Sequence, residues 1–96
     1  MRVMARITIP VESGNRAVKD GSLGALMQRA VERWKPEALY NTTFDGKRTS
    51  FIVFDLPDVS DMVPFTEPFF RELNAEVQLS PVMTGEDLQK GSARVD

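Results

Sequence analysis

The chain has 96 residues, of which 42% are hydrophobic and 27% charged, and its net charge is −2. Such a length and balance predict one small globular domain over residues 1–96, with one core and little room for a deep private active site. The sequence contains no cysteine and no histidine, which excludes disulfides, zinc–thiolate sites, thiol nucleophiles and the usual haem ligand. A carboxylate-only site for a hard cation remains open, but no run of Asp and Glu has the spacing of a calcium loop. We expect neither a metal nor a cofactor.

The isoelectric point of about 5.1 disfavours nucleic acid as a partner, because nucleic-acid binders usually carry a basic patch and a basic isoelectric point. No charged segment leads into an apolar run at the N-terminus, and no apolar run approaches the roughly 18 residues that span a bilayer. We expect a cytoplasmic protein with no membrane partner.

The first predicted element is a strand over residues 2–10, where apolar and polar side chains alternate until Pro10. One of its faces is purely apolar: Val3, Ala5, Ile7 and Ile9. Residues 11–20 are polar and predict a turn or a short helical piece. Residues 22–35 predict the main helix, which Ser22 can cap and which Pro36 ends. Its apolar face consists of Leu23, Leu26, Met27, Ala30, Val31 and Trp34.

Residues 38–44 and 47–56 predict a hairpin around Asp45-Gly46, a dipeptide that tolerates positive φ at both turn positions. A two-residue turn pairs Phe44 with Lys47, Thr43 with Arg48, Asn41 with Ser50 and Tyr40 with Phe51. The run from residue 51 to residue 54 is apolar on both faces, which is typical of a covered strand.

Residues 61–73 predict a second helix, capped by Asp58 or Ser60, with Pro64 in its first turn and a kink or irregular start at Pro68. Its expected apolar face is Met62, Phe65, Phe69, Phe70 and Leu73. Asn74 fits a left-handed cap. Residues 75–82 predict a fourth strand, and residues 84–87 predict the start of a short C-terminal helix.

This order predicts an α+β domain of ferredoxin-like βαββαβ type, in which a four-stranded antiparallel sheet carries two helices on one face. The purely apolar strand faces should meet the helices. We expect the hairpin to add six side chains to the opposite, mixed face: Asn41, Thr43, Arg48, Ser50, Ile52 and Phe54. That face could be a solvated surface, a single-stranded RNA platform or a dimer contact. We favour the dimer, because Met4, Ile52 and Phe54 are costly to leave in water.

Several segments carry a family resemblance: Ile9-Pro10, residues 17–21, 34–37, 42–48, 67–70, 73–75 and 81–83. Over nearly its whole length the chain resembles a group of small, functionally uncharacterised bacterial proteins of the dimeric α+β-barrel superfamily. The resemblance implies a homodimer whose sheets close into a shared barrel, with small-molecule pockets between helices and sheet. The superfamily includes cofactor-independent monooxygenases, muconolactone isomerases and haem-handling proteins. The histidine of the haem members is absent here, and no established catalytic motif matches.

Two residues are candidates for catalysis. Tyr40 could hydrogen-bond a substrate carbonyl or phenolate. A lone strand tyrosine is more often a half-buried packing residue whose hydroxyl reaches solvent. Glu67 stands next to apolar residues, where burial would raise its pKa and suit it to act as a base. The alternative for Glu67 is an exposed helix carboxylate.

Four residues are candidates for ligand binding. Trp34, Met27 and Phe69 could wall a flat aromatic pocket, or simply fill the core. Arg48 could bind an anionic ligand, or pair with an acid in the sheet or across a dimer. These features favour a non-catalytic homodimeric module that binds a small organic ligand or has a structural or regulatory role. The alternative is a cofactor-independent monooxygenase or isomerase acting on a small aromatic or polyketide-like substrate.

Overall fold

The computed structural model describes all residues from Met1 to Asp96 as an α+β structure with one antiparallel sheet. The sheet has four strands in the order β2-β3-β1-β4. The strands are β1 (Arg2–Ile9), β2 (Ala38–Phe44), β3 (Lys47–Asp55) and β4 (Glu76–Pro81). The helices are α1 (Val11–Asp20), α2 (Ser22–Trp34), α3 (Met62–Leu73) and α4 (Gly85–Ser92), with a 3-10 turn η1 (Val59–Asp61) before α3.

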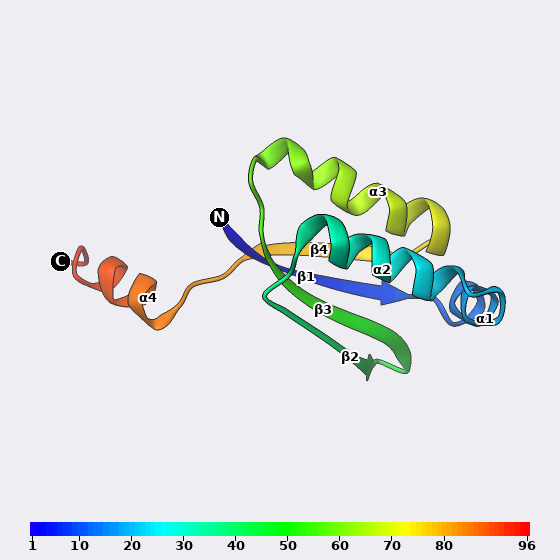
Figure 1. Ribbon diagram of the computed structural model, residues 1–96. Coiled ribbons are helices and arrows are strands. Elements are labelled where there is room, and N and C mark those ends of the chain that lie inside the picture. The colour runs from blue at the N-terminus through cyan, green and yellow to red at the C-terminus, as the bar shows by residue number, and fades with distance from the viewer.

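The elements form two layers (Figure 1). Helices α2 and α3 lie side by side on one face of the sheet, and α1 lies beyond the end of β1. The other face carries no helix, and we call it the open face. Helix α4 projects away from both layers, which gives the chain a radius of gyration of 15.2 Å. A compact domain of this length would have about 12.5 Å.

The register between the two central strands decides which side chains meet the helices. Val3 pairs with Phe54, and Ala5 pairs with Ile52. Directly opposed residues of paired strands project to the same face, so Ile52 and Phe54 lie with the buried face of β1 and are 2% and 1% exposed. The expected placement of the hairpin on the mixed face is therefore wrong for all six residues: Asn41, Thr43, Arg48, Ser50, Ile52 and Phe54.

The alternation within the hairpin is nevertheless confirmed. The register pairs Phe44 with Lys47 and Tyr40 with Phe51, as the two-residue turn requires, and the Thr43–Arg48 and Asn41–Ser50 pairs also form. Asp45 and Gly46 both have positive φ, at 53° and 74°. A hairpin pattern fixes which residues share a face but not which face is covered, and this segment is apolar on both.

Helix α1 is a regular helix of ten residues, whereas the sequence predicted a turn or a short helical piece. Its buried residues are small: Ser13, Gly14 and Ala17. Small side chains let the helix pack closely, and Ser13 Oγ donates a hydrogen bond to the carbonyl oxygen of Leu73. The segment is polar overall and buries only small side chains, so no large apolar residues mark its buried face, which is why the pattern did not reveal a full helix.

Helix α3 begins after η1, where Asp58 accepts a hydrogen bond from the backbone of Ser60, and it runs through Pro68 to Asn74 in the left-handed conformation. Its fully buried residues are Phe65, Phe69 and Leu73. Phe70 is 41% exposed, so its assignment to the apolar face is wrong. Met62 shares the face of Phe69 by helical spacing but is 39% exposed, because it is the first residue of α3. Successive helix residues are rotated by about 100°, which turns Phe70 away from the stripe that Phe69 occupies.

The core joins the sheet to both covering helices. Its thirteen buried members are Val3, Ala5, Ile7, Ile9, Ala17, Leu26, Ile52, Phe54, Leu56, Phe65, Phe69, Leu73 and Ala75. The rings of Phe54 and Phe65 stack with centroids 4.4 Å apart, and Trp34 lies edge-on to Phe65 at 5.7 Å. Of the face expected for α2, only Leu26 is fully buried, and Val31 is 43% exposed. Helix α2 therefore covers the sheet loosely.

Helix α2 ends at Lys35 in a left-handed conformation, which can be tested by substitution. Lys35 has φ 46° and ψ 60°, a left-handed conformation that costs an L-residue roughly 1–2 kcal/mol. Glycine avoids this cost, but it loses more conformational entropy on folding than other residues, which costs about 0.5–1 kcal/mol. We expect Lys35→Gly to raise the free energy of unfolding in urea by about 0.5–1 kcal/mol. The control Lys19→Gly, within α1, should lower it by about 1 kcal/mol, and equal losses in both variants would contradict the left-handed cap.

Candidate functional site

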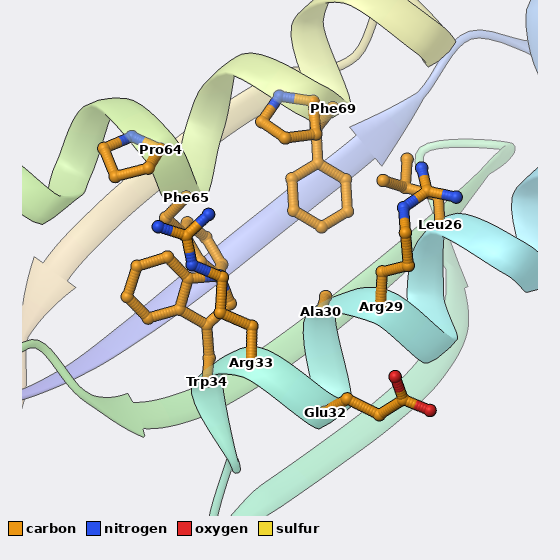
Figure 2. A pocket seen from close by; sticks show the side chains of 10 residues that line it. Leu26, Arg29, Ala30, Glu32, Arg33, Trp34, Pro64, Phe65 and Phe69 are labelled. Carbon is orange, nitrogen blue, oxygen red and sulfur yellow. The ribbon is translucent and has the colours of Figure 1, made fainter.

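The largest cleft of the structure lies between α2 and α3, and we call it the helix cleft (Figure 2). It has a volume of about 390 Å³. Its ten lining residues are Leu26, Arg29, Ala30, Glu32, Arg33, Trp34, Pro64, Phe65, Pro68 and Phe69. Figure 2 shows the rings of Trp34, Phe65 and Phe69 between the two helices, with two arginines rising from α2 at the rim.

Helical spacing explains how this short sequence builds the cleft. On α2, Leu26, Ala30 and Trp34 follow one another at intervals of four residues and share one face. The small side chain of Ala30 leaves a gap between two large ones. On α3, Pro64 and Pro68 repeat at the same interval and line the cleft from the other side. The cleft therefore exists because one wall has a methyl group where a larger side chain would close it.

The two arginines at the rim differ in their partners. Arg29 holds both carboxylate oxygens of Glu72 at 2.9 Å and is neutralised there. The guanidinium of Arg33 lies over the ring of Trp34, 4.8 Å from its centroid, and has no ion-pair partner. One cation is thus free at the mouth of an aromatic cleft.

A second cleft, which we call the hairpin cleft, lies between α2 and the β2–β3 hairpin. Its volume is about 280 Å³. The eight lining residues are Ile9, Leu23, Met27, Asn41, Thr42, Arg48, Thr49 and Ser50. The lining combines apolar groups from β1 and α2 with polar groups from the hairpin.

The structure separates the four candidate ligand-binding residues into two pairs. Trp34 and Phe69 line the helix cleft, whereas Met27 and Arg48 line the hairpin cleft. Sequence reasoning missed Ala30, Pro64, Pro68 and Arg33. The four-residue spacing of the two prolines was visible in the sequence, but it forms a cleft wall only because α2 packs beside α3.

The two candidate catalytic residues lie outside both clefts. Tyr40 is 70% exposed on the open face of β2. Glu67 lies on α3, where it accepts a hydrogen bond from Arg71 at 3.1 Å. Because α3 covers the opposite face of the sheet (Figure 1), Tyr40 and Glu67 lie on different sides of it.

The open face contains more large apolar groups than the sequence suggested. By the register, its residues outside the hairpin cleft are Met4, Arg6, Thr8, Tyr40, Phe44, Phe51, Val53, Glu76, Gln78 and Ser80. Arg6 donates to Gln78 at 2.6 Å and lies 5.3 Å from the centroid of the Phe44 ring. Three aromatic rings and one arginine therefore lie on the side without helices.

Three carboxylates have a lowered pKa, and each is held by hydrogen bonds in a turn or cap. Hydrogen bonds from Ser22 lower the pKa of Asp20, those from Ser60 lower that of Asp58, and those from Thr84 lower that of Asp87. Hydrogen bonds to the ionised form favour that form. None of the three lines the helix cleft or the hairpin cleft, so their role is to order the backbone.

No family model and no curated protein match this chain. No group of three or more acidic side chains is gathered as a metal site would require. None of the helices combines the length and apolar character needed to cross a bilayer. The fold and its clefts define an α+β domain with two small-molecule-sized cavities on the helix side of one sheet.

Proposed function

We propose that the protein is a non-catalytic, homodimeric module that binds a small organic molecule in the helix cleft. The observation that carries this proposal is an aromatic-walled cleft of about 390 Å³ in a chain of only 96 residues. Ligand pockets have volumes of about 300–1,000 Å³ and are mainly apolar, with a few polar groups that orient the ligand. The helix cleft meets both criteria.

The walls favour a flat, apolar ligand with an electron-rich polar end. Phe65, Phe69 and the two prolines offer rigid surfaces that lose little conformational entropy when a ligand binds. The guanidinium of Arg33 can donate to a hydroxyl, carbonyl or carboxylate at the mouth. Its position over Trp34 keeps its donors close to the aromatic wall.

The homodimer is the second part of the proposal, in the manner of the dimeric α+β-barrel superfamily. The antiparallel strand order β2-β3-β1-β4, with α2 and α3 on one face, supports a ferredoxin-like βαββαβ arrangement. The chain exposes 6489 Å², compared with roughly 5,500 Å² for a compact monomer of this mass. The excess resembles the roughly 800 Å² that one partner buries in a standard interface.

The occupant that we propose for the open face is a second copy of the same chain. A two-fold contact places the same surface on both partners. Apolar Met4, Phe51 and Val53 occupy the central strands of that face, where two copies would cover them. Arg6 on β1 and Glu76 on β4 supply opposite charges that a two-fold contact can bring together. Helix α4, with Leu88 55% exposed, offers further surface for the partner.

A cofactor-independent monooxygenase or isomerase would need Tyr40 and Glu67 at one substrate. The two side chains lie on opposite sides of the sheet and outside both clefts. No specific observation therefore favours the enzyme over the binding module.

The proposal can be tested through Trp34, which is the only tryptophan and lies in the cleft wall. We expect 2-naphthol, a flat neutral aromatic with one hydroxyl, to change the Trp34 fluorescence in a saturable manner. Ala30→Leu should lower its affinity by at least about tenfold, because the added methylenes occupy the volume that the ligand needs. The matched control Ala25→Leu, at an exposed position of α2, should bind as the native chain does.

Equal affinity in both alanine variants would place the ligand elsewhere and contradict the proposal. No saturable change in the native chain would do the same. Circular dichroism of both variants checks that α2 still forms, so that lost binding is not lost folding.

A further inference from the structure

Arg48 is the one arginine that lines the hairpin cleft, and it is only partly exposed. It takes part in none of the five ion pairs of the chain. A partly buried cation is usually paired, because removing a charge from water is costly. The absence of an acidic partner beside a cleft is the observation from which we start.

The strand register places the Arg48 side chain on the helix side of the sheet. Arg48 pairs with Ile9, whose side chain faces the helices and is 2% exposed. A Cβ atom at Gly14 would lie 2.7 Å from Arg48 Nη1 and 3.2 Å from Ile9. Gly14 therefore leaves the space in which the guanidinium lies, and any other residue at that position would displace it.

Most of the hydrogen-bonding capacity of Arg48 is unused within the chain. Nη2 donates to Asn15 Oδ1 at 3.2 Å, which is one of about five N–H donors in a guanidinium. Two residues further along the same strand, Ser50 Oγ donates to Oδ1 of Asn41 on the neighbouring strand β2 at 2.6 Å. This bond uses the amide oxygen of Asn41 and leaves its nitrogen as a donor. The cleft thus combines one unpaired cation with a free amide donor.

The rest of the cleft is apolar, because Ile9, Leu23 and Met27 form its other wall. We propose that the hairpin cleft is a separate binding site for a small monocarboxylate with an apolar body. Arg48 binds the carboxylate in a bidentate manner, Asn41 adds a hydrogen bond, and the apolar wall covers the hydrocarbon. A single arginine matches one negative charge. The volume of about 280 Å³ lies just below the roughly 300–1,000 Å³ of drug-sized ligand pockets, so the site suits a ligand smaller than these.

The site goes beyond the helix cleft, since the two clefts share no lining residue. Binding at the two clefts can therefore be read independently. Signals from Arg48 and Asn41 report the hairpin cleft, and the Trp34 indole reports the helix cleft.

The experiment is an NMR titration of the native chain with hexanoate, 1-hexanol and inorganic phosphate. We expect hexanoate to shift the Arg48 Nε–H and Asn41 side-chain amide signals in a saturable manner, with little change at the Trp34 indole. The neutral 1-hexanol and the phosphate should each bind at least about tenfold more weakly. Equal affinity for hexanoate and 1-hexanol would overturn the role of the cation, and equal or tighter phosphate binding would overturn the carboxylate class.

Two variants test whether the Arg48 guanidinium binds the carboxylate. Arg48→Met should reduce hexanoate affinity by at least about tenfold. Gly14→Ala should reduce it as well, by displacing the guanidinium, while its better helix propensity preserves α1. The control Arg71→Met, on α3, should bind hexanoate unchanged. Native affinity in either folded variant would overturn the site. Because Gly14→Ala keeps the cation and displaces it only, this variant decides alone where Arg48→Met fails to fold.

Discussion

Replacing Phe65 with alanine is expected to lower the free energy of unfolding by roughly 3–5 kcal/mol. Phe65 is 1% exposed and contacts three other rings, with its centroid 4.4 Å from Phe54, 5.7 Å from Trp34 and 5.5 Å from Phe69. A domain of this length has a total stability of roughly 5–14 kcal/mol. The variant should therefore lose a large share of it. Urea unfolding followed by circular dichroism measures the change.

Phe70→Ala is the matched control, because the sequence alone placed Phe65 and Phe70 on the same apolar face. Phe70 is 41% exposed, so its loss should cost about 1 kcal/mol or less. Comparable losses for the two variants would mean that α3 is rotated about its axis relative to the arrangement described above. The pair thus tests the orientation of α3 directly.

The arrangement of the strands was largely accessible from the sequence, because it depends on local chemistry. Asp45-Gly46 fixed the hairpin register, and the alternation in β1 identified its buried face. The faces of the hairpin were assigned to the wrong side, because its contact with β1 spans some forty residues of chain and has no local signal. Residues 51–54 are apolar on both faces, so periodicity could not decide which face of the hairpin meets the helices.

The candidate site was only partly accessible for a related reason. Trp34 and Phe69 were recognised as wall residues because large aromatics are conspicuous in a sequence. The cleft itself depends on the absence of side-chain volume at Ala30, and an alanine in a helix gives no such signal. Likewise, Arg48 is unpaired because Gly14 leaves space for its guanidinium and no acid lies nearby. Both conditions depend on residues that are neighbours only in the folded structure.

The corrected faces also change the character of the open face. Phe54 was the one aromatic expected there, whereas the register places Tyr40, Phe44 and Phe51 on it, beside Arg6. Exposed aromatics with a basic neighbour are also what single-stranded RNA platforms present. The net charge of −2 and Glu76 on the same face weigh against a polyanion. A second copy of the chain therefore remains the better occupant.

The strongest test of that occupant is Val53→Glu. Val53 lies on the central strand β3 and pairs with Met4 on the open face. In the proposed dimer its glutamate would be buried without a partner, at a cost of roughly 3–5 kcal/mol per copy. Since each 1.4 kcal/mol is a factor of ten and both copies of the dimer carry the change, we expect the dissociation constant to rise by about ten-thousandfold or more. Light scattering during size-exclusion chromatography should show native mass near twice 10.8 kDa and a monomeric variant.

Val63→Glu is the matched control, because Val63 is 63% exposed on α3, on the other side of the sheet. The same chemical change there should leave the dimer intact. A native chain that is monomeric at micromolar concentration would contradict the assignment, as would a Val53→Glu variant that remains dimeric. Salt-sensitive binding of single-stranded RNA by the native chain, lost in Val53→Glu but kept in Val63→Glu, would assign the open face to RNA. Met4, Phe51 and Val53 lie together on the central strands of the open face. Contiguous apolar surface is costly to leave in water, so the Val53 and Val63 variants together test whether a second chain covers it.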